Sequence, residues 1–135
     1  MAGFKTTYYS NLILNTEYSG GVVATWYFAL FTVLPGVDGL GGTEVTIGSN
    51  GYARLAVTAN TTNFPAIVSA LMSNGTVFNF GTPTGPGWGM IVGVGQYDAS
   101  SGGNLYRVYA EGPPIVAAAG IPFAYPIGTF TTSES

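Results

Sequence analysis

Short runs of β-branched and aromatic residues, separated by glycines, prolines and Asn-Gly pairs, are the feature that most constrains the fold of this chain. The run at 24–32 carries apolar side chains on both of its faces, which is typical of a central strand buried on both sides. Asn50-Gly51 and Asn74-Gly75 each carry the strongest short-range signal for a hairpin turn. Further segments with strand character lie at 44–47, 52–58, 69–72, 77–80, 88–97, 105–110 and 127–131.

Roughly seven or eight short strands, with a turn about every ten residues, predict an all-β fold. We expect an antiparallel β-sandwich of the jelly-roll kind or a partly closed barrel. The segment Phe4–Tyr18 has apolar residues at helix-compatible spacing and stops at Ser19-Gly20-Gly21, so it is a short helix or an extended arm. The expected organisation is an N-terminal helix or arm at 1–21 and one β domain at 22–135.

Two further signals concern single strands. Gly93 and Gly95 lie inside the 88–97 run, and glycine within a strand indicates a bulge or a close approach of another group to the backbone. Pro113-Pro114 is expected to end the strand that begins at residue 105.

The chain carries very little charge. Charged residues make up 7% of the sequence and hydrophobic residues 47%, with a mean hydropathy of +0.35. Three separated cations cannot form the basic face that binding to nucleic acid requires, so we expect no nucleic-acid partner. The longest apolar stretch, 22–37, is interrupted and shorter than a membrane-spanning helix, so we expect no membrane partner. Apolar residues in excess of a small core favour a protein interface, although a monomer rich in glycine and alanine remains an alternative.

The residue types needed for catalysis are scarce. The sequence has no cysteine and no histidine, which excludes a thiolate metal site and a Ser-His-Asp triad. A glycosidase would need a carboxylate pair from among Asp38, Glu44, Asp98 and Glu111, and their spacing fits turn and loop roles better. We therefore expect no enzyme, no catalytic residue, no metal site and no cofactor.

Interface residues are expected in the aromatic N-terminal segment, at the two strand arginines and in the proline-rich C-terminal part. Each arginine lies among aromatic residues and either forms an ion pair, within one subunit or across an interface, or extends its charged end into solvent. Trp88 ends a Pro/Gly-rich loop and is either a core residue or a platform for a host glycan. The expected interface residues are Phe4, Tyr8, Tyr9, Leu12, Arg54, Arg107, Pro113, Pro114, Phe123 and Tyr125.

Several short motifs follow one another along about four fifths of the chain. They are Ser10-Asn11-Leu12, the run 26–32, Gly41–Val45, Gly51–Arg54, Ser73–Thr76, Trp88-Gly89, Val94-Gly95, Tyr97-Asp98-Ala99 and Gly102–Leu105. Their order resembles a family of short bacteriophage virion proteins commonly labelled tail-fibre proteins. The chain departs from that family's pattern over 113–125 and in its last strand, 126–131.

The resemblance implies a structural protein of the virion, made in the cytoplasm of the bacterial host. The leading hypothesis is a capsid decoration (cement) protein on the head surface, a trimer or dimer that binds the major capsid protein and stabilises the shell. The alternative is a tail-fibre or tail accessory module that binds tail proteins and attaches to a host receptor or glycan. A third reading is a soluble binding domain unrelated to phage.

Overall fold

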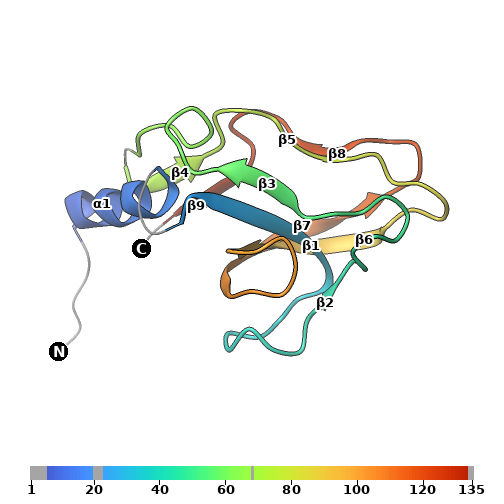
Figure 1. The fold of residues 1–135 in the computed structure, drawn as a ribbon. Helices are drawn as coiled ribbons and strands as arrows, with labels where there is room; N and C mark the ends of the chain where they lie inside the picture. The colour runs from blue at the N-terminus through green and yellow to red at the C-terminus, as the bar shows by residue number, and fades with distance from the viewer. Residues whose placement is uncertain (1–5, 20–22, 68, 134–135) are drawn as a thin grey trace. The chain divides into compact units, whose positions relative to one another are not determined.

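The computed structural model of the chain describes residues 6–19, 23–67 and 69–133. The fold consists mainly of antiparallel β-sheets with one short helix, which confirms the predicted class, and the sheets stay open instead of closing into a barrel (Figure 1). No helix among the described residues has the length and hydropathy needed to cross a membrane. The elements are α1 (Thr7–Tyr18), β1 (Thr25–Val33), β2 (Thr43–Glu44), β3 (Leu55–Thr58), β4 (Leu71–Ser73), β5 (Phe78–Gly81), β6 (Gly89–Tyr97), β7 (Leu105–Ala117), β8 (Phe123–Tyr125) and β9 (Thr131–Ser133).

The chain forms two compact units. The first unit takes the described residues of 1–25, 58–78 and 125–135, and the second takes 26–57 and 79–124. The expected division into an N-terminal element at 1–21 and a β domain at 22–135 stays a prediction.

The largest sheet has the strand order β2-β1-β6-β7, and β3 also pairs with β1 (Figure 1). Four consecutive residues of β1, Phe28–Phe31, are at most 3% exposed. Because successive side chains of a strand point to opposite faces, this confirms that the run at 24–32 is a central strand buried on both sides.

Two glycines of β6 allow large side chains to lie against its backbone. A Cβ atom added at Gly95 would lie 2.4 Å from Cε2 of Phe31, and one added at Gly93 would lie 2.3 Å from Cδ2 of Leu34. The close approach predicted from glycine inside this strand is therefore confirmed.

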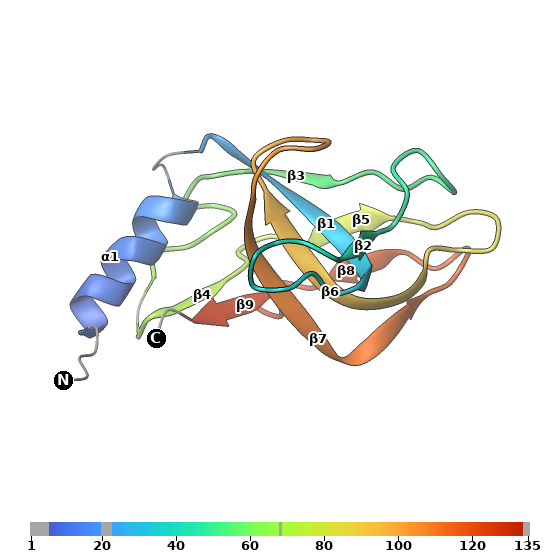
Figure 2. The same cartoon turned by 90° about the horizontal axis from the view of Figure 1, so that it is seen from below.

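β7 is longer than expected and contains two irregularities in its pairing with β6. Residues 105 and 107–110 pair with one half of β6 and 115–117 with the other half, whereas 106 and 111–114 have no register partner. The expectation that Pro113-Pro114 ends this strand is wrong. Proline is tolerated there because the two residues fall in the bulge, at the end of the sheet, where no bond to β6 is lost (Figure 2).

The two Asn-Gly pairs behave differently. Asn50 and Gly51 have positive φ values of 52° and 80°, so the predicted turn is present. The strands expected on either side of it do not form a hairpin, because β2 and β3 each pair with β1. The hairpin predicted at Asn74-Gly75 is absent as well, since β4 pairs with β9 and β5 with β8.

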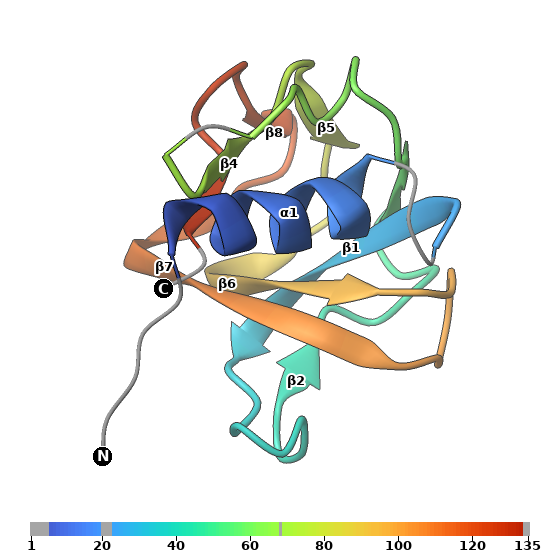
Figure 3. The same cartoon turned by 90° about the vertical axis from the view of Figure 1, so that its left-hand side faces the viewer.

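Asparagine side chains organise the first unit. Thr6 caps α1 by accepting a hydrogen bond from the N–H of Tyr9, 3.3 Å away. One turn apart on the helix, Asn11 and Asn15 accept hydrogen bonds from main-chain N–H groups at residues 70 and 67, at 2.6 and 2.9 Å. The helix, which lies beside β4 in Figure 3, therefore fixes the loop that precedes this strand.

Asn74 is 1% exposed and holds the C-terminal segment of the first unit. Its Nδ2 group donates to the carbonyls of Tyr125 (3.3 Å) and Pro126 (3.0 Å), and its Oδ1 accepts from the N–H of Phe130 (2.9 Å). These bonds explain why Asn74 is not a hairpin residue. The closing strand expected at 127–131 is replaced by β8 and β9, with a turn at Pro126–Thr129 between them.

Candidate interaction surface

Arg54 is the centre of a polar network inside the second unit. Its side chain is 4% exposed, and its Nε and Nη2 groups contact the two carboxylate oxygens of Glu44 at 3.0 and 2.9 Å. Its Nη1 group donates to the carbonyls of Ala99 and Gly102, both at 2.8 Å, and its guanidinium lies 3.7 Å from the centre of the Tyr97 ring. This paired geometry and the ring contact both favour arginine over lysine.

The network continues through a tyrosine into the central strand. The hydroxyl of Tyr52 donates to Glu44 at 2.8 Å and accepts from the N–H of Leu30 at 2.9 Å. Burial is the main reason that the pKa of Tyr52 is raised, and the negative charge of Glu44 adds to it. Burial lowers the pKa of Arg54, but the hydrogen bonds and charge of Glu44 outweigh it, and the pKa is raised. Both side chains keep their ordinary charge states at neutral pH, so the network acts as a fixed brace.

The loop 34–40 leaves β1 and presents apolar side chains to solvent. Val37 is fully exposed and Leu40 is 70% exposed. The loop is nevertheless held in shape, because the N–H of Gly36 donates to the carbonyl of Leu40 at 2.8 Å and Asp38 accepts from the N–H of Leu40 at 3.0 Å. Because these hydrogen bonds already hold the loop in one conformation, binding to a partner would cost it little further conformational entropy. This favours a contact role for its apolar tip.

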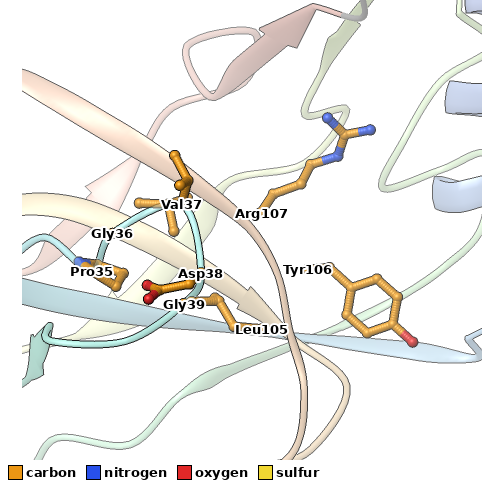
Figure 4. Close-up of a pocket in the computed structure, with 9 residues that line it drawn as sticks. Pro35, Gly36, Val37, Asp38, Gly39, Leu105, Tyr106 and Arg107 are labelled. Atoms are coloured by element: carbon orange, nitrogen blue, oxygen red, sulfur yellow. The ribbon is translucent and has the colours of Figure 1, made fainter.

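An open pocket of about 370 Å³ separates this loop from the start of β7 (Figure 4). Its walls are residues 35–39 on one side and 105–108 on the other. In the close-up, Leu105 lies toward the loop, whereas Tyr106 and Arg107 extend away from it in different directions. A second open pocket shares Asp38, Gly39 and Leu105 with the first, so the loop has a hollow on each side.

Exposed apolar side chains continue along β7 and its neighbour β6. Val116 is 61% exposed and Met90, which lies opposite it in the register, is 53% exposed. Tyr106, Val108 and Ile115 are between 37% and 47% exposed. We call the loop 34–40 together with these exposed residues of β6 and β7 the β7 surface. Exposed apolar side chains such as these are candidates for contact with a partner.

The residues expected at an interface fall into three groups. Tyr8, Tyr9 and Leu12 are 77%, 52% and 47% exposed on α1, and Phe4 lies outside the described residues. Pro113 and Pro114 are exposed in the bulge of β7, and Arg107 is half-buried nearby. Phe123 and Tyr125 are at most 8% exposed and the Arg54 side chain is 4% exposed, and an interface role for these three residues stays a prediction.

Trp88 is a core residue in this structure. It is 4% exposed, its ring meets that of Tyr52 edge-on at 5.4 Å, and its Nε1 group donates to the carbonyl of Asn50 at 2.9 Å. The expected glycan platform would need an accessible ring face, which this position does not offer.

Three of the four carboxylates considered as a glycosidase pair each make a different local contact. Glu44 pairs with Arg54, Asp38 caps its own loop, and Asp98 accepts from the N–H and side-chain amide of Asn104 at 2.8 and 3.0 Å. Those hydrogen bonds hold the pKa of Asp98 below its usual value. Within the described part of the chain, no cluster of three or more His, Cys, Asp or Glu residues is placed to hold a metal ion.

Sequence reasoning missed the loop 34–40, and in the C-terminal half of β7 it named Pro113 and Pro114 but not the exposed Ile115 and Val116. The available signal was the pair of valine and leucine side chains, Val37 and Leu40, inside a glycine-rich loop, where apolar residues have no strand or helix to bury them. Arg54 was noticed, but its partner could not be chosen among three carboxylates.

Comparison with known proteins identifies the family of the chain. No curated protein matches the sequence. A family model described as Podophage GP4 fiber I protein gp80 matches residues 5–122, which includes α1, the whole central sheet and the β7 surface. The chain therefore belongs to this family of podophage fibre proteins, in agreement with the resemblance seen in its motifs.

Proposed function

We propose that this protein is a non-enzymatic structural module of the phage tail, which takes its place by binding other tail proteins through the β7 surface. The observation that carries the proposal is the family match over residues 5–122, because the description of that family names a fibre. This favours the tail over the head surface, where a capsid decoration protein would lie.

The physical properties of the second unit support a contact role. The Arg54 network and the buried β1 strand make a rigid framework, and the loop 34–40 is fixed on it with its apolar tip exposed. Covering these exposed apolar side chains with a partner removes apolar area from water, which favours association. Attachment to a host glycan through Trp88 is not part of the proposal, since that ring is buried.

Labelling intact phage particles with an antibody to this chain, followed by electron microscopy, tests the location. We expect label at the tail. Label spread over the head would overturn the proposal in favour of capsid decoration, and label on neither would exclude a virion role.

A second experiment tests the surface. We expect a Val37→Ser and Leu40→Ser double variant to be incorporated into particles much less than the native chain, because it removes apolar contact area without touching the core. Ile127→Ser is the matched control, since Ile127 is 63% exposed and lies in the other unit. Equal incorporation of all three proteins would show that the loop makes no contact in the virion.

A further inference from the structure

The edge of β7 is an unused pairing site. Among the described residues, β6 is the one strand that pairs with β7, which ends the order β2-β1-β6-β7. The outer main-chain groups of a terminal strand are a ready template for another strand, and natural proteins usually shorten or cover such edges. Here the edge strand is 13 residues long.

The pocket in Figure 4 adjoins the start of this strand. Four consecutive residues of β7, 105–108, form one of its walls. An extended segment that paired with the free edge of β7 would lie near this pocket, whose other wall is the loop 35–39.

We propose that this segment is β7 of a second copy of the chain, paired antiparallel about a two-fold axis that passes beside Tyr109. In this register a residue that precedes Tyr109 by a given number of positions in one copy lies opposite the residue that follows Tyr109 by the same number in the other copy. Arg107 of one copy therefore lies opposite Glu111 of the other, and this opposite-charge pair occurs twice. A shift of the axis by one residue would place Arg107 opposite Tyr109 and lose both charge pairs.

The neighbouring residues suit the same register. Val108 lies opposite Ala110, both exposed, so their side chains form one apolar row across the two copies. Pro113 and Pro114 cannot donate main-chain hydrogen bonds, so they limit the paired segment to residues before Pro113. Arg107 and Glu111 also interact within their own chain, and the contact between copies adds to those interactions.

This inference rests on the proposed assembly role and names one partner for the β7 surface. It is testable on the isolated chain, so its failure would leave the location of the protein on the virion untouched. One strand pair buries less area than a standard stable interface, and we therefore expect a reversible dimer that depends on concentration.

Disulfide trapping gives the sharpest test because the chain has no cysteine. Val108→Cys and Ala110→Cys are made as separate variants and mixed under mild oxidation. Directly opposed residues of antiparallel strands have Cα atoms about 4.5 to 5.5 Å apart, which is within the range of a disulfide. We expect the mixture to give cross-linked heterodimer several-fold faster than either variant alone. A mixture of Ala110→Cys with Ser101→Cys, an exposed turn position, measures random collision.

Charge exchange provides an independent readout. Sedimentation equilibrium should show weaker self-association for Arg107→Glu and for Glu111→Arg, and recovery in the double variant, with circular dichroism confirming that each protein is folded. A monomer at all concentrations, or cross-linking of 108 to 110 no faster than the collision control, would overturn the proposal. Cross-linking without recovery by charge exchange would overturn the Arg107–Glu111 pairing between the two copies.

Discussion

Removing the Arg54 side chain should destabilise the second unit more than any other single change in its polar groups. The change Arg54→Met keeps the aliphatic stem but leaves Glu44 without its two hydrogen bonds and the carbonyls of Ala99 and Gly102 without a donor. It also frees the turn after β6, which the arginine ties to Glu44 at the edge of the sheet.

The magnitude lies between two known limits. Breaking a fully buried ion pair by removing one partner costs about 3 to 5 kcal/mol, whereas an exposed pair contributes about 0 to 1 kcal/mol. Arg54 is 4% exposed and Glu44 is 17% exposed, so the remaining carboxylate can regain some water. We expect a loss of about 3 kcal/mol, which lowers Tm by about 10 °C for a chain of this length.

A double-mutant cycle separates the ion pair from the other contacts. Arg54→Met, Glu44→Gln and the double variant are unfolded by urea while tryptophan fluorescence is recorded. Both tryptophans, Trp26 and Trp88, are buried in the second unit and therefore report on it. We expect a coupling energy of about 2 kcal/mol between the two sites. A coupling below about 0.5 kcal/mol would refute the reasoning, since the pair would then behave like an exposed one.

Three further predictions concern other parts of the chain. Asn74→Ala should cost about 3 kcal/mol and make the segment 125–133 sensitive to proteases, because several buried main-chain groups lose their partner; a protease pattern like that of the native chain would contradict this. Gly95→Ala should cost about 1 to 3 kcal/mol by forcing the Phe31 ring to move, whereas Gly112→Ala, with open space around it, should cost much less in the same urea titration. The pKa of Asp98 is lowered in the folded state, so its contribution to stability is present above its unfolded pKa of about 3.9 and is lost as pH falls through the folded value. Asp98→Asn should therefore weaken the pH dependence of Tm below about pH 4, and an unchanged profile would count against the role of this turn.

Some of these features could be read from sequence because they are local. The buried β1 strand and the turn at Asn50-Gly51 each depend on residues close together in the chain, whereas the sequence left the segment 4–18 open between a helix and an extended arm. Glycine at position 95 likewise signals a close approach before its neighbour is known. Composition determined just as much, since a chain without histidine or cysteine and with few charges has limited means for chemistry.

Only the tertiary structure decided which strands are neighbours. β4 pairs with β9 and β5 pairs with β8, across more than 40 residues, and no local signal chooses among such partners. The same long-range contacts turned Asn74 from an expected turn residue into a buried anchor of the C-terminal segment.

The sequence by itself therefore determined the β class, the positions of most strands and the poverty of reactive groups. The tertiary structure decided which apolar residues are buried. Trp88, Phe123 and Tyr125 lie in the core, whereas Val37 and Leu40 are exposed to solvent. The physical reason is that conformational preference is a property of each residue and its near neighbours, whereas burial depends on which distant segments cover it.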